Sequence, residues 1–193
     1  MKRSIVLAFG VLLSIGCAAQ ETSVAVPESA FVSSEQYTSA FFGFSLPLPQ
    51  DSALRGFALP SNFHSLFGLQ AQTNGLTTFA IFAKETSGAS SKLARKAAAG
   101  PKEEYTKKIN IDGKEVWKSD TQQRSAVGTM RTIDYETAIN GYLLSFKIVS
   151  FDPKLTDTLQ HSIESIKFFD PTKAREMAGP NSREYHPAAR SNN

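Results

Sequence analysis

The chain has 193 residues, of which 41% are hydrophobic and 20% charged, a composition typical of one globular domain with tails. Its net charge of +3 comes from its two ends, because the body between Cys17 and Pro171 holds fifteen basic and sixteen acidic residues. A nearly neutral body excludes the extended basic surface with which proteins bind nucleic acid.

Residues 1–19 have the pattern of a signal peptide. Two basic residues precede an uncharged apolar run at 5–15, which is too short to span a bilayer as a stable helix. The single cysteine of the chain, Cys17, follows this run. The segment 13–17 (LSIGC) resembles a bacterial lipoprotein signal, although Ser14 stands where that family prefers leucine.

That resemblance implies cleavage before Cys17, which then becomes the N-terminus and carries acyl chains that insert into a membrane. The alternative is ordinary secretion, with cleavage after Ala19. We therefore expect an exported protein of the cell envelope, anchored through lipid at Cys17 and facing the periplasm or the exterior, or else a soluble periplasmic or secreted protein. A lone cysteine in an exported chain favours the anchored form, since an unpaired thiol is otherwise a liability.

Composition divides the rest of the chain into three parts. Residues 20–36 are rich in Ser, Thr, Glu and Ala and have little apolar periodicity, which is typical of a flexible tether. Residues 37–170 have the alternating and periodic apolar patterns of a folded domain. Residues 171–193 contain Pro, Gly, Asn, Ser and Arg without an apolar pattern, which predicts a disordered tail.

The first half of the domain predicts three strands followed by a helix. Alternating apolar residues predict an edge strand at 41–49, which ends at two prolines, and further strands at 63–69 and 76–83. The last two are separated by an Asn-Gly turn. A short alanine-rich helix is expected at 93–98, where a Gly-Pro pair then stops it.

Two dipeptides predict tight hairpins in the second half of the domain. Asp112-Gly113 and Asn140-Gly141 both suit primed turns, because Asn, Asp and Gly tolerate the positive φ that these turns need. The strand that follows the second turn is apolar at every second position from Tyr142 onward and is also apolar on part of its other face. Such a strand is expected to be central in its sheet.

A helix is predicted directly after this strand. Asp152 can cap the free amides of its first turn, and Pro153 fits there because it has no N–H to lose. Apolar residues recur every three to four positions from Leu155 to Ile166, so one face of the helix should pack on the sheet. A short closing strand is expected at 167–169.

Strands joined by tight turns are antiparallel, so the pattern predicts an α+β domain with a central antiparallel sheet and helices packed on both faces. The Gly43-Phe44 strand after Tyr37, the two hairpins and the Ser165–Phe168 ending resemble PsbP-like domains. The resemblance covers 37–169 and implies an α/β/α sandwich. Members of that superfamily are accessory or binding proteins, among them a photosystem subunit and a nuclear-transport cofactor, and many are exported lipoproteins.

The sequence contains no constellation that indicates catalysis. His64, His161 and His186 are dispersed, and no spacing typical of a metal site, phosphate loop or activated nucleophile is present. We therefore expect no enzyme activity, metal or cofactor. Asp134 and Glu136 share one face of a strand, and we interpret them as a solvated edge rather than a reactive carboxylate pair.

The segment 54–67 has apolar residues without clean periodicity and is the candidate contact surface, with Arg55, Phe57, Phe63 and His64 as its named residues. The alternative is that this segment simply packs over one end of the sheet. The sequence therefore favours a non-catalytic accessory or binding protein that contacts another envelope component. The alternative function is a soluble periplasmic carrier of a small apolar ligand.

Overall fold

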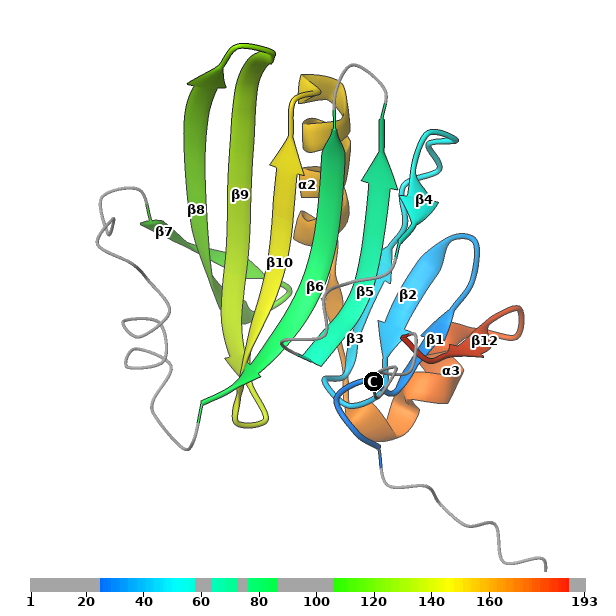
Figure 1. Cartoon of the computed structure of the whole chain (residues 1–193). Coiled ribbons are helices and arrows are strands. Elements are labelled where there is room, and N and C mark those ends of the chain that lie inside the picture. Colours follow the sequence, from blue (N-terminus) through cyan, green and yellow to red (C-terminus); the bar gives the residue numbers. More distant parts are fainter. Residues whose placement is uncertain (1–24, 58–63, 73–75, 87–105, 188–193) are drawn as a thin grey trace, which may run out of the picture.

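The computed structural model describes residues 25–57, 64–72, 76–86 and 106–187, which form two antiparallel sheets and two short α-helices (Figure 1). The small sheet has the order β11-β3-β2-β1-β12, and the large sheet has the order β4-β5-β6-β10-β9-β8-β7. The elements are β1 (Ala30–Val32), β2 (Gln36–Ser39), β3 (Phe44–Pro47), β4 (Arg55–Gly56), β5 (His64–Ala71), β6 (Thr77–Glu85), β7 (Thr106–Ile111), β8 (Lys114–Ser125), β9 (Gly128–Ile139), β10 (Tyr142–Ser150), α2 (Pro153–Glu164), β11 (Lys167–Phe168), the 3₁₀ turn η2 (Pro171–Lys173), α3 (Ala174–Ala178) and β12 (Arg183–Tyr185).

Both predicted hairpins are confirmed. Asp112 and Gly113 join β7 to β8 with φ of 47° and 81°, and Asn140 and Gly141 join β9 to β10 with φ of 52° and 79°. These are the positive angles that a primed turn needs and that most side chains resist. The two turns therefore fix the register of the strands on either side of them.

The prediction that β10 is central is also confirmed, because this strand lies between β6 and β9 along its whole length. Its residues Leu144, Phe146 and Ile148 are at most 2% exposed. Opposite them on the neighbouring strands lie residues such as Ile81 and Ile133, both fully buried. The core of the protein is thus centred on one face of the large sheet.

Helix α2 covers that face, as the sequence predicts. The carboxylate of Asp152 accepts hydrogen bonds from the backbone amides of Lys154 and Leu155, at 2.9 and 3.2 Å, and so caps the first turn. The apolar stripe that includes Leu159 and Ile163 is buried. Burying such side chains contributes roughly 2 kcal/mol each.

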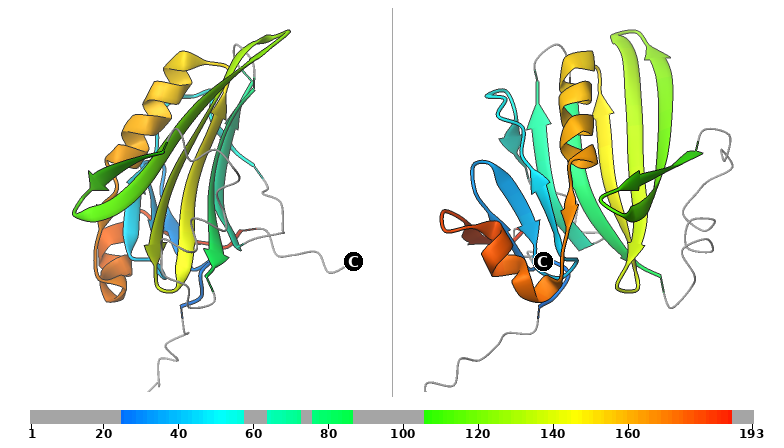
Figure 2. Two further views of the ribbon diagram at one scale, coloured as in Figure 1. Left: turned by 90° about the vertical axis from the view of Figure 1, so that its left-hand side faces the viewer. Right: turned by 180° about the vertical axis from the view of Figure 1, so that it is seen from behind.

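The small sheet covers the same face of the large sheet beside α2 (Figure 2). The ring of Phe44 in β3 lies 5.4 Å from that of Phe146 in β10, and the ring of Tyr37 in β2 lies 4.8 Å from that of Phe67 in β5. The domain therefore consists of the large sheet and a cover made of α2 and the small sheet, with an aromatic core between them.

The prediction of helices on both faces of the sheet is therefore wrong for the described residues, since α2 and the small sheet share one face. The helix predicted at 93–98 lies outside the described residues. The physical reason for the error is that the strands near the N-terminus do not extend the large sheet. They pair among themselves and with β11 and β12 to form a second sheet that takes the place of helical cover.

Order also extends into the segments expected to be a tether and a tail. Ala30 in β1 pairs with Tyr185 in β12, so residues from 30–36 and from 171–185 belong to the folded domain. The guanidinium of Arg175 lies 5.1 Å from the ring centre of Phe31, and Gln36 donates a hydrogen bond of 2.9 Å to the carbonyl of Met177. The two segments are ordered here because each supplies the other with a strand partner. Among the helices of the described ranges, none has the length and hydropathy that crossing a membrane requires.

Candidate functional site

The hairpin of β8 and β9 extends beyond the part of the sheet that other elements cover (Figure 1). The two strands pair continuously from Trp117 opposite Glu136 to Ser125 opposite Gly128. Strand β7 pairs only with Lys114–Ser119 of β8. Within the described residues, Asp120–Ser125 therefore forms an edge of the sheet, with β9 on one side and no partner strand on the other. The hairpin tip beyond it carries Val127, which is 82% exposed.

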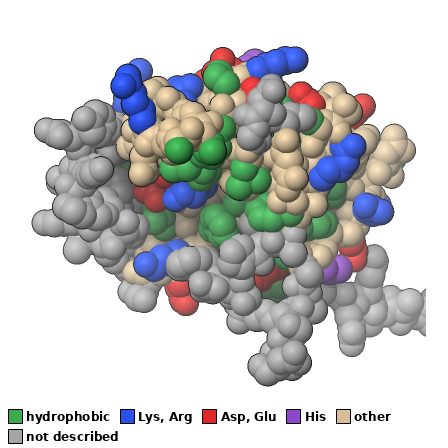
Figure 3. All heavy atoms as spheres, turned by 45° about the horizontal axis from the view of Figure 1, so that its top comes forward, with side chains coloured by type: hydrophobic (Ala, Val, Ile, Leu, Met, Phe, Trp, Pro, Cys, Tyr) green, Lys and Arg blue, Asp and Glu red, His purple; other side chains and the backbone are tan. Residues whose placement is uncertain are grey.

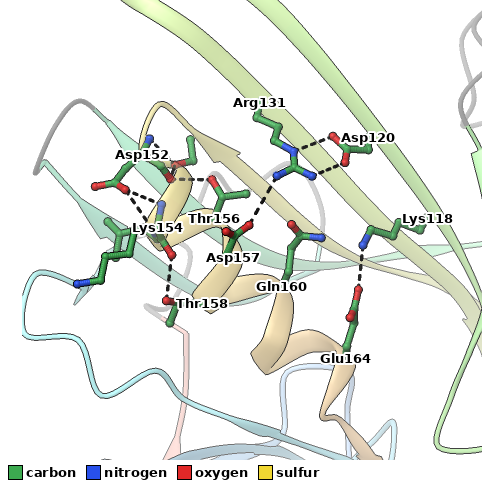
Figure 4. Close-up of polar contacts among 12 residues, drawn as sticks. Lys118, Asp120, Arg131, Asp152, Lys154, Thr156, Asp157, Thr158, Gln160 and Glu164 are labelled. Atoms are coloured by element: carbon green, nitrogen blue, oxygen red, sulfur yellow. Dashed lines mark hydrogen bonds and ion pairs between the residues drawn. The ribbon is translucent and has the colours of Figure 1, made fainter.

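Charged side chains connect the base of this hairpin to α2 (Figure 4). The ammonium of Lys118 in β8 lies 2.8 Å from the carboxylate of Glu164 at the end of the helix. The guanidinium of Arg131 in β9 donates two hydrogen bonds to Asp120, of 3.0 and 2.6 Å, and also lies 3.8 Å from the carboxylate of Asp157. We call these residues, together with Gln160, the polar seam.

Tyr135 lies at the centre of the polar seam. Its hydroxyl donates a hydrogen bond of 2.7 Å to Glu164 and accepts one of 3.2 Å from the side-chain amide of Gln160. The ammonium of Lys118 also lies 4.9 Å from the centre of its ring, a cation–π distance. Tyr135 is therefore held by side chains of α2 and by a side chain of β8.

Three groups at this place, Tyr135, Lys118 and Glu164, are held in their ordinary charge states. Burial raises the pKa of Tyr135. Burial alone would lower the pKa of Lys118 and raise that of Glu164. Their mutual hydrogen bond, and the bonds of both with Tyr135, outweigh burial, so the pKa of Lys118 is raised and that of Glu164 lowered. A neutral phenol, a charged amine and a charged carboxylate at neutral pH are suited to holding the hairpin in place, not to acid–base chemistry.

Asp134 and Glu136 share a strand face, as predicted, but the interpretation of that face as a solvated edge is wrong. Strand β9 is an interior strand, and both residues are partly buried. Asp134 lies 3.3 Å from the ammonium of Lys147, and Glu136 accepts a hydrogen bond of 3.3 Å from Ser145. Burial raises the pKa of Asp134 despite its partner. Each carboxylate thus has its own cross-strand partner on β10.

The structure does not bring the residues of the sequence-based contact surface into one cluster. Arg55, exposed in β4, pairs with the Gln70 end of β5, whereas His64 lies at the opposite end of that strand beside Glu28. Phe57 is half-buried, and its amide donates a hydrogen bond of 3.2 Å to the carbonyl of Gly68. Phe63 lies outside the described residues, as does Cys17.

The remaining histidines are not part of the polar seam. His161 is exposed on α2, and His186 is exposed beyond β12, 3.9 Å from the carboxylate of Glu184. In the part of the chain that the structure describes, no three His, Cys, Asp or Glu side chains are grouped as a metal site.

Sequence reasoning expected two strands between the Asp112-Gly113 and Asn140-Gly141 turns, but it missed that their hairpin projects and that the polar seam forms. The segment from Lys118 to Thr132 is polar, so apolar alternation gives no strand signal there. One available signal was the spacing of Asp157, Gln160 and Glu164, which puts three polar residues along one flank of α2 beside its apolar face.

The fold and the projecting hairpin can now be compared with known proteins. No family model matches the chain, and no curated protein matches its sequence. Three solved structures resemble it at a TM-score of 0.50. LpqN of Mycobacterium tuberculosis, described as involved in cell envelope biogenesis, is 13% identical, and the match covers 66% of this chain and 83% of LpqN.

The second is a Bacteroides thetaiotaomicron protein, 11% identical, with 70% of this chain and 48% of that one covered. The third is the cyanobacterial PsbP protein, CyanoP, of Synechocystis, 9% identical, with 79% of this chain and 98% of CyanoP covered. The class defined by this architecture is an antiparallel-sheet domain covered on one face by a helix and a small sheet. Within that class the chain has a PsbP-like fold, which confirms the resemblance found in the sequence.

Proposed function

We propose that the protein is a non-catalytic accessory or binding protein of the cell envelope and that the β8–β9 hairpin is its contact element. The observation that carries the proposal is the exposure of the hairpin beyond the polar seam. All residues from Thr121 to Thr129 are exposed, although the base of the same hairpin is tied to α2. A hairpin that is held at its base and uncovered at its end is suited to meeting another protein, because little ordering entropy is lost on binding.

The chemistry of the described residues supports contact rather than catalysis. The charged groups of the polar seam are paired with one another, and the hydrogen bonds of Lys118 and Glu164 raise the pKa of the first and lower that of the second, so both stay charged at neutral pH. Acidic and basic side chains are interspersed on the face seen in Figure 3, which suits recognition by shape and hydrogen bonding. The description of LpqN as a protein of envelope biogenesis is consistent with an envelope role for this fold.

The sequence-based alternative, a carrier of a small apolar ligand, requires a cavity between the large sheet and its cover. In the described core, that space contains packed side chains such as Phe44, Phe146 and Leu159, with the first two rings 5.4 Å apart. This packing favours the contact protein over the carrier. Arg55 and His64 remain candidates for contacts at two separate places, since they lie at opposite ends of β5.

Membrane anchoring through lipid at Cys17 is part of the proposal. It would keep the domain at the surface where envelope partners reside. The mass of the protein recovered from membrane and soluble fractions tests it. We expect a membrane-bound form that begins at Cys17 and carries acyl chains, and Cys17→Ser should release it. A soluble form that begins at Gln20 would remove the anchor.

The contact element is tested by replacing Val127 with a photocrosslinking amino acid in the full chain, expressed in cells. The matched control carries the same group at Lys154, which is exposed on α2. We expect adducts with a defined envelope protein from position 127 and none of these from position 154. Equal adducts from both positions, or none from the hairpin, would contradict the assignment.

A further inference from the structure

The uncovered edge of β8 has the properties of a strand that pairs with another strand. Asp120–Ser125 is held in extended form by β9, so every second backbone amide and carbonyl of this stretch points away from β9. Natural proteins usually protect such an edge with prolines, bulges or repeated lysines. The sequence here is DTQQRS, which contains no proline or lysine, and the register of β8 with β9 is continuous.

The side chains of this edge are complementary to themselves. Asp120, Gln122 and Arg124 alternate along β8 and so lie on one face, which is the face toward α2 because Asp120 binds Arg131 of the polar seam. In an antiparallel pair of two such strands centred on Gln122, each Asp120 lies directly opposite Arg124 of the other copy. The ion pairs found among the described residues do not include Arg124, and the contact would add to the two hydrogen bonds that Asp120 already accepts from Arg131.

We infer that the occupant of the β8 edge is a second copy of this chain, so that two large sheets join into one across a two-fold axis at Gln122. The inference rests on the proposed function in so far as the hairpin is the contact element, and it names the partner of the free edge. Strand β7 limits the pairing to the stretch that starts at Asp120, since it already pairs with Lys114–Ser119. Both copies are limited in the same way, so their free stretches match in length.

A cysteine placed at the proposed axis tests the register. In the full chain carrying Cys17→Ser, Gln122→Cys would bring two thiols directly opposite each other, at a Cα separation of roughly 5 Å that a disulfide can bridge. We expect Gln122→Cys to form a disulfide-linked dimer under mild oxidation. The control Gln123→Cys faces Thr121 of the other copy rather than itself and should crosslink far less. Equal crosslinking of both variants would contradict the register.

The charge pairing is tested by sedimentation of the full chain in mild detergent. We expect a reversible dimer of the wild type and at least a tenfold weaker dimer of Arg124→Asp, in which two carboxylates face each other twice. Arg124→Lys keeps the positive charge opposite Asp120 and should dimerise as the wild type does. Circular dichroism of each variant confirms that the fold is kept.

The outcomes separate this inference from the proposed function. If the protein stays monomeric at high concentration and Gln122→Cys does not crosslink, the inference fails, whereas envelope adducts from Val127 would still support the contact role. If Gln122→Cys crosslinks and Val127 captures only the same chain, self-association stands and the proposed contact with another envelope protein fails.

Discussion

The two halves of β8 show how one strand can serve both stability and contact. Lys114–Ser119 pairs with β7, and its last three residues, Trp117–Ser119, also pair with β9; Val116 in this half is 2% exposed. Asp120–Ser125 is bordered by β9 alone and is largely exposed. The difference does not come from strand propensity, since both halves are extended and both contain residues paired with β9. It comes from what lies beside them, and the polar seam marks the boundary between the two.

The largest difference is expected in the core beneath the hairpin base. Ile133→Ala removes a fully buried side chain of β9 and should cost about 3 kcal/mol, because the surrounding core cannot collapse into the space left behind. Thr129→Ala, in the exposed end of the same strand, should change stability by less than about 0.5 kcal/mol. Urea unfolding of both variants measures the contrast. Similar losses would mean that the end of the hairpin is packed as tightly as its base.

A smaller effect is expected in the polar seam. Glu164→Ala removes the acceptor for both Lys118 and Tyr135 and should cost about 1–2 kcal/mol, since these partners are only partly exposed. The control is Asp157→Ala, because the Asp157 side chain is 75% exposed and lies 3.8 Å from Arg131. It should cost less than about 0.5 kcal/mol. Thermal unfolding of the two variants compares them directly, and equal costs would show that the bonds of Glu164 do not hold the hairpin.

Glu164 in the polar seam and Asp134 on the opposite face of the sheet should change the stability of the protein in opposite directions as the pH falls. The folded-state pKa of Glu164 is lowered from its ordinary 4.5, because the hydrogen bonds from Lys118 and Tyr135 outweigh burial. Its stabilisation is complete above that pH and is lost as the pH falls through the lowered pKa. Burial raises the pKa of Asp134 from its ordinary 3.8, so its ionised form costs stability, and this cost disappears as the pH falls through the raised pKa.

Thermal unfolding from about pH 7 to about pH 3 tests these signs against Glu164→Gln and Asp134→Asn. We expect the advantage of the wild type over Glu164→Gln to shrink with falling pH. Relative to Asp134→Asn, the wild type should gain stability over the same range. Parallel pH curves for the wild type and both variants would contradict the pairing described here.

Local signals in the sequence predicted those parts of the fold that local chemistry decides. The hairpins at Asp112 and Asn140 need positive φ, and the start of α2 needs a cap such as Asp152; each requirement is written in adjacent residues. The small sheet could not be predicted in this way. Ala30 pairs with Tyr185, and neither of these three-residue strands reveals a partner so distant in the chain.

The candidate site was likewise predictable from local patterns but not in its long-range contacts. The apolar face of α2 was readable from its periodicity, but no local pattern predicts that Arg131 of β9 meets Asp157 of α2. The surface predicted around Arg55 and His64 failed to form one cluster because β5 separates the two residues by its own length. Residues that are close in the sequence are therefore not always close in space when a strand lies between them.

The most direct test of the account is hydrogen exchange of the β8 amides in the full chain, dilute and then in its assembled form with its partner. We expect slow exchange throughout Trp117–Ser119, the stretch of β8 that is paired on both sides, in both states. Within Asp120–Ser125, every second amide should exchange rapidly in the dilute protein and slowly after assembly, because a new strand then accepts its hydrogen bond. Slow exchange of all these amides in the dilute protein, or unchanged rapid exchange after assembly, would show that the free edge of β8 is not the contact element.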